Sequence, residues 1–296
     1  MAGGRAVAER MRALALHPAM SPRQAGRVVT AACLRHFRAN LAGAKAGDDH
    51  ERLHQARVAL RRLRCARKIF PGSGEGKTAA ADLKWLAGQL GQARDLDVLL
   101  GENLPAAEDA AGEGAGFGKL RQALSQRSER CRREAQAALA SPCCENLLSA
   151  LPACRHPQRE DADAKLRRFA RRILRRRRRG LRRLAERWRT LDPEQLHQLR
   201  KQAKALRYAA EFFAPLFDAG AAARYLFRLQ RVQDLLGAIH DAAAGRALLA
   251  QCGPAEDGEL ARAAGFVDGW LAQAAAQAGQ RLGRALGRLE GAKRFW

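Results

Sequence analysis

The side chains in this sequence that are best suited to chemistry are arginines and histidines that recur three or four positions apart. In HQARVALRRLRCARKIF, which begins at His54, cations follow at Arg57, Arg61, Arg64 and Lys68. Arginine presents a rigid fork of N–H donors that matches phosphate oxygens, and it stays charged at physiological pH. Histidine donates a hydrogen bond to phosphate when it is protonated, and it also serves as a general base or accepts a phosphoryl group. The pattern predicts a site for a phosphate-bearing anion.

The pattern occurs a second time in the chain. ERLHQARVALRRLRCARKIF at 51–70 aligns without a gap with EQLHQLRKQAKALRYAAEFF at 194–213, and the equivalent positions hold His197, Arg200, Lys204 and Arg207. A merely solvated face would be free to exchange lysine, glutamate, glutamine and serine between the two copies. Retention of the cations therefore favours a functional anion site over a solvated face, and it indicates a duplicated unit.

Helical geometry explains the spacing within each copy. At about 100° per residue, positions 54, 57, 61, 64 and 68 fall within a sector of about 80° on one side of a helix. We call these positions the first basic stripe, and the second basic stripe comprises His197, Arg200, Lys204 and Arg207. A stripe of about 14 residues covers roughly 20 Å of helix, which exceeds a single phosphate and suits an extended polyanion. Two equivalent stripes are available to face each other.

The composition favours helix along nearly the whole chain. Ala, Leu and Arg dominate, aromatic residues make up 5%, and a chain of 296 residues with 47% hydrophobic content can bury a sizeable core. Apolar periodicity and punctuation predict four helices in each half, at 21–44, 54–70, 83–100 and about 120–131, then at 164–189, 192–216, 221–249 and 259–289. We expect an all-α protein built of two tandem homologous four-helix bundles.

The repeat also predicts the domain organisation. We expect an N-terminal extension at 1–20, a first helical half at 21–140, a linker at 141–163 and a second helical half at 164–296. Within the first half, the glycine-rich GENLPAAEDAAGEGAGFG at 101–118 is predicted to be a connection between helices.

The charge balance indicates the kind of partner. Lys and Arg number 54 against 30 Asp and Glu, and the resulting net charge of +24 favours an anion. The sequence contains neither a run of about 18 uncharged apolar residues nor a signal-peptide core, so we expect a cytoplasmic protein with no membrane partner. Seven cysteines, an odd number without framework spacing, agree with a reducing compartment.

A second pair of similar blocks follows the stripes. LKWLAGQLGQARDLDVLL at 83–100 resembles LQRVQDLLGAIHDAAAGRALL at 229–249, and the alignment places Asp95 over Asp241. These carboxylates belong to different halves and each has a basic neighbour, so we expect them to orient stripe arginines rather than to bind a metal. We expect no obligatory metal and no other cofactor, although Mg²⁺ can accompany the anion.

One further segment, KLRRFARRILRRRRRGLRRLAERWR at 165–189, carries fourteen cations and one acid. Its apolar residues recur at helical spacing, which favours a first helix of the second half with a very basic solvent face. An outer extension of the anion-binding surface, or a nonspecific contact to nucleic acid, fits the segment equally well. Both interpretations stay open at this point.

Two other classes of function compete with binding of a simple anion. Nonspecific nucleic-acid binding explains the charge, but four Trp and two Tyr leave few platforms for stacking bases. A phosphohydrolase or phosphotransferase explains the histidines, yet the stripes hold no acid for a catalytic metal, and GSGEGKT at 72–78 lacks the P-loop spacing. We therefore expect a binding protein that is not an enzyme, with these two classes as the alternatives.

The order of these motifs resembles a known family. HQARVALRRLR followed by LGQARDLDVL, and LHQLRKQAKALRY followed by LLGAIHD, are similar to the CHAD family, the conserved-histidine α-helical domain, over about 21–289. The resemblance implies paired four-helix bundles whose basic cleft or pore binds inorganic polyphosphate without turnover, often at polyphosphate granules. Weak nucleic-acid binding is the alternative partner. Carried over residue by residue, the resemblance implies that the polyphosphate site is lined by His54, Arg57, Arg61, Arg64, Arg94, His197, Arg200, Lys204, Arg207 and His240. To these residues we add Lys68, the last cation of the first basic stripe.

Overall fold

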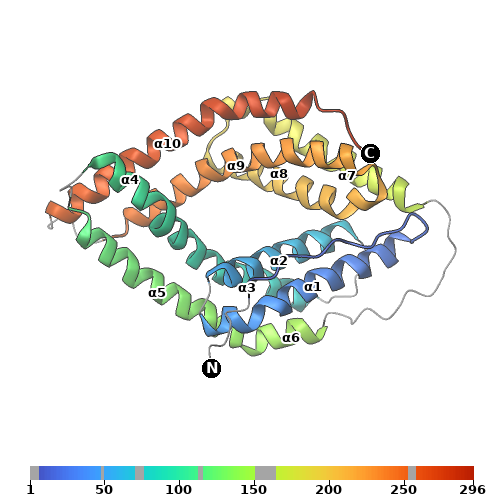
Figure 1. Ribbon diagram of the computed structural model, residues 1–296, viewed down its shortest axis with the longest axis horizontal. Coiled ribbons are helices and arrows are strands. Elements are labelled where there is room, and N and C mark those ends of the chain that lie inside the picture. The colour runs from blue at the N-terminus through green and yellow to red at the C-terminus, as the bar shows by residue number, and fades with distance from the viewer. Residues whose placement is uncertain (1–6, 48–49, 71–76, 113–115, 151–164, 253–257) are drawn as a thin grey trace.

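The described part of the protein is all-α, as the composition predicts. The computed structural model describes residues 7–47, 50–70, 77–112, 116–150, 165–252 and 258–296, which form helices and connections without a β-strand (Figure 1). The predicted fold class is thereby confirmed. No helix in these ranges is both long enough and apolar enough to cross a bilayer.

The eight predicted helices occur in the predicted order, and the described part of the first half contains two more, α4 and α6. The helices of the first half are α1 Pro22–Ala46, α2 His50–Ile69, α3 Lys77–Val98, α4 Leu104–Ala111, α5 Gly118–Ala140 and α6 Pro142–Ala150. A five-residue π-helical turn, Leu99–Asn103, joins α3 to α4. In the second half they are α7 Lys165–Ala185, α8 Pro193–Phe213, α9 Ala219–Leu249 and α10 Gly258–Glu290. Short 3₁₀ turns at Trp188–Thr190 and Ala214–Leu216 follow α7 and α8.

Capping residues determine where α1 and α8 begin. The backbone N–H of Gln24 donates to Ser21 Oγ, and the backbone N–H of Ser21 donates to Gln24 Oε1, which forms a capping box. Asp192 and Gln195 form the same box at α8, and a proline follows the cap in both helices. The second basic stripe therefore begins about one turn inside a well-defined helix start.

Two segments predicted to be connections contain helix instead. The predicted linker 141–163 begins with α6, and the predicted connection 101–118 includes α4. Burial explains α6, because Cys144 and Leu147 are each 1% exposed within the larger core. A helix of nine residues gains its stability from such packing rather than from propensity, so periodicity does not reveal it. The remainder of the predicted linker, 151–163, lies outside the described residues.

Residues 7–20 of the predicted N-terminal extension lie against the helical body. Leu14 and Leu16 are buried in the larger core. Asn40 of α1 donates from Nδ2 to the carbonyl oxygen of Glu9 at 2.9 Å, and it accepts from the backbone N–H of Glu9 at 3.0 Å. The described part of the extension is therefore integral to the fold of the first half.

The helices of the two halves contact each other in equivalent order. Helix α1 contacts α7, α2 contacts α8, α3 contacts α9, and α5 contacts α10. In Figure 1, α2 and α3 lie opposite α8 and α9. A duplicated unit would give this pairing, although the duplication itself stays a prediction from the sequence. The arrangement brings the two helices that carry the basic stripes into contact.

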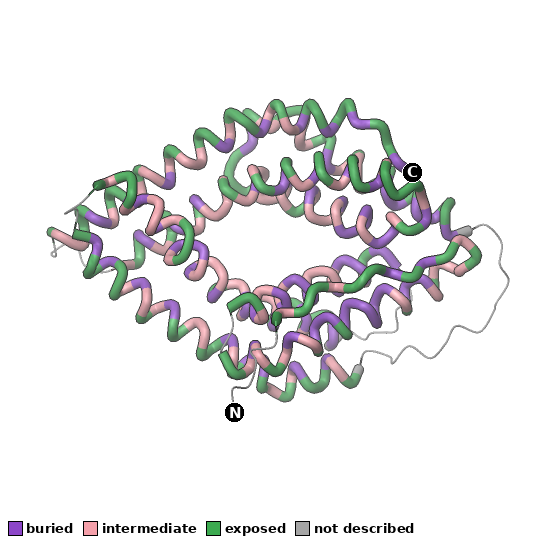
Figure 2. The backbone as a smooth tube through the Cα atoms, in the orientation of Figure 1, coloured by how far each residue is buried: buried purple, intermediate pink, exposed green. Residues whose placement is uncertain are grey.

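The larger hydrophobic core includes residues from both halves. Long runs of buried positions on α1 and α2 contribute to it (Figure 2). At its centre Phe70, Phe169 and Phe213 form what we call the aromatic cluster, with ring centroids 5.6 to 6.1 Å apart. A smaller core around Leu99 and Val267 holds α3, α4, α5, α9 and α10 together elsewhere. The two halves therefore share one core at the ends of the stripe helices.

Candidate anion-binding site

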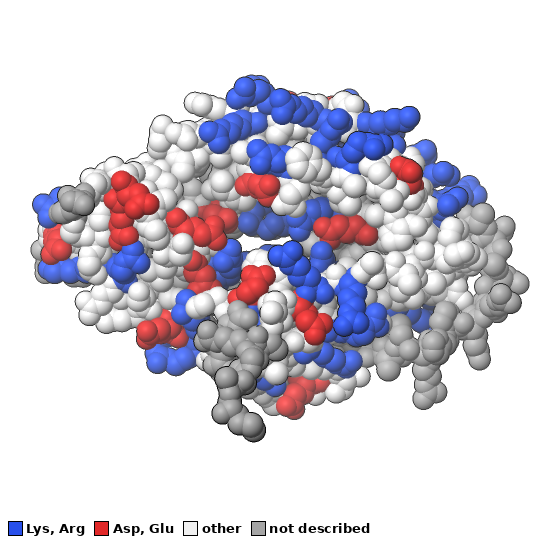
Figure 3. All heavy atoms as spheres, in the orientation of Figure 1, with Lys and Arg blue, Asp and Glu red and all other residues white. Residues whose placement is uncertain are grey.

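The helices that carry the two basic stripes meet through direct contacts. Arg62 Nη2 on α2 lies 2.8 Å from Glu211 Oε2 on α8, and Cys65 Sγ lies 3.9 Å from the carbonyl oxygen of Ala205. Figure 3 shows Lys and Arg side chains, together with several Asp and Glu side chains, around a hollow in the middle of the face in view. The stripes are thereby held on facing helices rather than on opposite surfaces of the molecule.

Residues from four helices form one group, which we call the central cluster. Beyond the effect of burial, the charge of Arg57 on α2 lowers the pKa of both Lys204 on α8 and His240 on α9, so these groups lie near one another. The cluster consists of His54, Arg57, Arg61, Arg94, Asp95, His197, Arg200, Lys204, His240 and Asp241. Eight of the eleven predicted site residues therefore come together in space.

Two carboxylates of the central cluster pair with stripe arginines. Arg57 Nη2 lies 3.8 Å from Asp95 Oδ1, and Arg200 Nη2 lies 3.3 Å from Asp241 Oδ1. The two pairs occupy equivalent positions in the two halves, and both arginine side chains are less than 20% exposed. A half-buried guanidinium is costly without a counter-charge, so these carboxylates hold the forks in place. The predicted pairing of the two aspartates with stripe arginines is confirmed, and their orienting role stays a prediction.

The cationic side chains of the central cluster repel one another strongly. Burial, followed by the charges of Arg200 and Arg61, lowers the pKa of Lys204 to about 6. Burial and the charge of Arg61 likewise lower the pKa of Arg57 to about 10, which leaves this guanidinium charged at neutral pH. Cations so placed stabilise an incoming anion, because the anion removes the repulsion and compensates the burial.

The three histidines of the cluster are neutral at physiological pH in the free protein. Burial, followed by the charge of Arg94, lowers the pKa of His54 to about 4. Burial, followed by the charge of Arg200, lowers the pKa of His240 to about 3, and burial also lowers that of His197. The rings of His197 and His240 stack with centroids 5.1 Å apart. A neutral imidazole keeps one N–H donor, so each histidine can still donate one hydrogen bond to an anion.

Several buried donors of the cluster lack a partner within the described residues. His54 Nδ1, Arg61 Nε and Arg200 Nε are each buried and make no hydrogen bond there. Buried polar atoms in folded proteins are nearly always paired, and an unpaired one costs about 1–3 kcal/mol. Phosphate oxygens would satisfy the N–H groups among these atoms.

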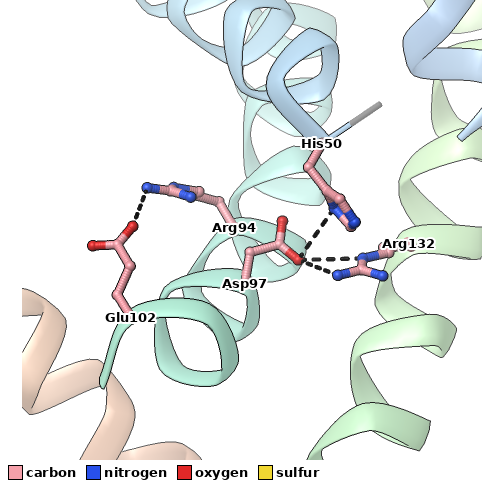
Figure 4. A network of polar contacts seen from close by, with 5 residues as sticks. All are labelled: His50, Arg94, Asp97, Glu102 and Arg132. Atoms are coloured by element: carbon pink, nitrogen blue, oxygen red, sulfur yellow. Dashed lines mark hydrogen bonds and ion pairs between the residues drawn. The ribbon is translucent and has the colours of Figure 1, made fainter. Parts of the chain in front are cut away.

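Arg94 extends from α3 close to the contacts that link this helix to α5 and to the start of α2 (Figure 4). Its Nη2 lies 3.0 Å from Glu102 Oε1 on the π-helical turn, and its charge acts on His54. One turn away, Asp97 Oδ1 accepts hydrogen bonds from Arg132 of α5 at 2.7 and 3.2 Å and lies 3.8 Å from His50 Nδ1. These contacts tie α3 to α5 and to the start of α2, which fixes the position of Arg94.

Three predicted residues are not among the groups that define the central cluster. Arg207 pairs through Nε with Glu211 Oε1 at 3.2 Å, and Glu211 also binds Arg62. Arg64 is half-buried on α2, and Lys68 is exposed near its end. Neither is among the groups that most affect the pKa of Lys204 or His240.

The residues that sequence reasoning did not single out are structural partners of the site. Arg62, Glu102, Asp97 and Arg132 position the stripe helices and α3 through the contacts described above. Arg62 aligns with an alanine in the second copy, so the internal comparison carries no signal for it. Glu102 lies in the segment predicted to be a connection, where no helical register was available to place its side chain.

The comparisons with known proteins identify the family. A family model for the CHAD domain matches residues 29–250, and the chain therefore belongs to the CHAD family, as its motifs indicate. The crystal structure of the CHAD domain from the plant Ricinus communis is similar, with a TM-score of 0.83, 28% identity and 98% of each chain covered. PptA from Streptomyces chartreusis shares the fold, with a TM-score of 0.66, 19% identity, and coverage of 90% of this chain and all of PptA. No curated protein matches the chain.

Proposed function

We propose that this protein binds inorganic polyphosphate in the central cluster and does not turn it over. Membership of the CHAD family supports the ligand, because the family includes proteins that bind polyphosphate. The geometry supports the mode of binding, because both stripes and the companion blocks contribute side chains to one group. A linear polyanion lying between α2 and α8 would contact both halves of the chain.

The convergence of the two stripes is the observation that carries this proposal. Arg57, Arg61, Arg94 and Arg200 contribute cations to the cluster, and Lys204 adds a further charge when it is protonated. Three carboxylates, on Asp95, Glu102 and Asp241, pair with these arginines. Forked guanidinium donors suit adjacent phosphate groups, and charge-assisted contacts of this kind are each worth about 1.5–3 kcal/mol. A phosphate chain also relieves the repulsion that lowers the pKa of Lys204.

The pairing of the acids of the cluster supports binding without catalysis. Asp95 and Asp241 each pair through Oδ1 with a stripe arginine, Arg57 or Arg200. A metal-assisted attack on a phosphoanhydride requires carboxylates that hold the metal beside the reacting phosphorus. Incubation with long-chain polyphosphate and Mg²⁺ or Mn²⁺ should therefore release no orthophosphate above a denatured control. Steady release that disappears in His54→Ala or His197→Ala would make the protein an enzyme.

A competition assay tests the identity of the ligand. Labelled long-chain polyphosphate is bound at about 150 mM salt, where exposed charges are screened beyond about 8 Å, and is displaced by single-stranded or double-stranded DNA at matched phosphate concentration. We expect DNA to displace it poorly. The logarithm of the binding constant should fall with the logarithm of salt by about 0.7 per neutralised phosphate, by analogy with single strands. Equal displacement by DNA would favour nonspecific nucleic-acid binding instead.

Association with polyphosphate granules is the cellular counterpart of this proposal. A fluorescent fusion of the full chain should concentrate at granules in cells that make polyphosphate and spread evenly in cells that lack it. A fusion carrying Arg57→Ala and Arg200→Ala should spread evenly in both. Granule localisation that survives these substitutions would show that the central cluster does not direct it.

A further inference from the structure

Helix α7 carries a second basic region outside the central cluster. Its arginines at positions 168, 171, 172, 175, 178 and 179 are spaced so that they share one face of the helix. Leu166, Ile173 and Leu174 lie on the opposite face, where they are buried in the larger core. With Arg294 and Pro22, the six arginines line a cavity of about 890 Å³, which we call the α7 cavity.

The shape of the α7 cavity is not explained by a solvated helix face alone. Three separate segments form it, because Pro22 begins α1 and Arg294 lies in the segment that follows α10. A smaller cavity of about 440 Å³ adjoins it and shares Arg175, Arg178 and Arg294. Chain segments from both ends of the protein thus meet α7 to make a hollow rather than a flat basic surface.

The charge in the α7 cavity is nearly uncompensated. No Asp or Glu lines it, and of its arginines Arg178 is held by Glu290 at 2.9 Å. Within the described residues, Arg168, Arg175 and Arg179 are exposed and make no hydrogen bond or ion pair with a carboxylate. Their guanidinium forks are therefore available to a ligand, and clustered cations of this kind attract polyanions strongly.

The lining favours a phosphate chain without bases. Phe169, the aromatic residue in the lining, is 8% exposed, and the guanidinium of Arg172 lies 5.4 Å from its ring centroid. A nucleic acid would find no free ring in the lining of the α7 cavity itself on which to stack its bases. The arginine face runs about 16 Å along α7, which exceeds the reach of a single phosphate.

We propose that the α7 cavity is a second binding site for inorganic polyphosphate, independent of the central cluster. The identity of the ligand rests on the proposed function, whereas the existence of the site rests on the cavity and its free arginines. The aromatic cluster separates the two sites, because Phe169 lines the cavity and packs on Phe70 and Phe213 at the ends of α2 and α8. One chain thus holds two polyphosphate segments and bridges long polymers.

Calorimetric titration with tripolyphosphate tests the site, because this probe is too short to span both regions. The wild type should bind about two equivalents. Arg175→Ala with Arg179→Ala should weaken the outer site by at least about tenfold and leave one equivalent, since each loss removes a charge-assisted contact. Arg57→Ala with Arg200→Ala should also leave one equivalent. Arg281→Ala with Arg288→Ala, which removes the same charge from exposed positions of α10, should leave two.

The outcomes separate this inference from the proposed function. The wild type could bind only one equivalent of tripolyphosphate, which is lost in Arg57→Ala with Arg200→Ala and kept in Arg175→Ala with Arg179→Ala. This result would refute the α7 site and leave the proposed function standing. No tripolyphosphate binding by a wild type that binds the long polymer would also refute the site. Equal displacement of the outer equivalent by single-stranded DNA would assign the cavity to nucleic acid instead. If tripolyphosphate still binds at the α7 cavity in Arg57→Ala with Arg200→Ala, the inference is supported even when the central cluster binds another ligand.

Light scattering gives a second, independent readout. Long-chain polyphosphate should cross-link the wild type into large particles, because each chain offers two sites. Circular dichroism should show that the variant with Arg175→Ala and Arg179→Ala keeps its helix content. The same variant should then bind the polymer without forming particles, and particle formation equal to that of the wild type would contradict bivalence.

Discussion

The central cluster and the α7 cavity both concentrate arginine, yet they balance its charge in different ways. In the central cluster Arg57 and Arg200 are half-buried, and each has a carboxylate partner. In the α7 cavity Arg175 and Arg179 are exposed and the lining holds no acid. Burying an unpaired guanidinium is costly, whereas water and salt screen an exposed one. Burial therefore imposes a fixed geometry on the central arginines, and exposure leaves the α7 arginines free to adapt.

The largest effect is expected from removing one guanidinium in each half of the central cluster. Arg57→Ala with Arg200→Ala removes two charge-assisted contacts worth about 1.5–3 kcal/mol each, so affinity for long-chain polyphosphate should fall at least about tenfold. Titration at fixed salt measures the loss, and circular dichroism checks that the variant is folded. If Arg281→Ala with Arg288→Ala lowers the affinity as much, the protein binds polyphosphate as a diffuse polycation. The arginines of the central cluster would then be no more important than exposed ones.

The second prediction concerns the carboxylates that distinguish the two regions. Asp95→Asn with Asp241→Asn leaves two half-buried guanidinium groups without counter-charges, which should lower the free energy of unfolding by roughly 1 kcal/mol per pair. Saturating polyphosphate should restore most of this stability, because phosphate oxygens replace the carboxylates. Thermal melts with and without polyphosphate measure both effects. A loss of stability that polyphosphate does not reduce would mean that the aspartates act only on the fold.

The third prediction concerns pH and the lysine of the central cluster. In the free protein Lys204 has a pKa of about 6, and a bound polyanion raises it, so binding takes up a proton between pH 6 and the raised value. Affinity should therefore fall as pH rises above 6, by at most about tenfold per pH unit. Lys204→Arg should flatten this profile, because arginine stays charged. Titrations at constant ionic strength in two buffers of different ionisation enthalpy measure the proton uptake, and an unchanged profile in Lys204→Arg would contradict the assignment.

The smallest effect is expected on the free energy of unfolding of the protein when arginines of the α7 cavity are replaced. Arg175→Gln with Arg179→Gln relieves repulsion among exposed arginines, so unfolding free energy at low salt should rise by a few tenths of a kcal/mol. The gain should vanish near 1 M salt, where the screening length is about 3 Å. A variant that is less stable than the wild type at every salt concentration would show that these arginines hold α7 in place.

The sequence predicted the parts of the fold that depend on local signals. The capping box at Ser21 and the one at Asp192 mark helix starts that the structure contains. Helix α6 was missed because its stability comes from burying Cys144 and Leu147, and a short segment carries too little periodicity to indicate this. The shared core was missed for a related reason, since the hydrophobic pattern within one half does not indicate contacts with the other half.

The candidate site was predictable to the extent that the duplication encodes it. Comparison of the two copies singled out His54 and His197, and it also indicated the pairing of Asp95 and Asp241 with stripe arginines. Arg207 pairs with Glu211 four residues further along α8, and helical spacing alone predicts such a pair. The contact of Glu211 with Arg62 of α2 depends on the fold and was not predictable. For the basic run at 165–189 the sequence left an outer anion-binding surface open, but it did not predict the α7 cavity, because Pro22 and Arg294 lie far from α7 in the chain.

The aromatic cluster has a consequence for how the protein is made. Phe70 leaves the ribosome about 140 residues before Phe213, and at 5–20 residues per second this interval lasts on the order of 10–30 s. During that time the end of α2 lacks the rings that bury it, and its cationic stripe has no opposing helix. Cellular polyanions and chaperones therefore meet an unfinished first half. Its stable folding must wait for a contact of very high sequence separation, which slows folding and makes the isolated half prone to aggregate.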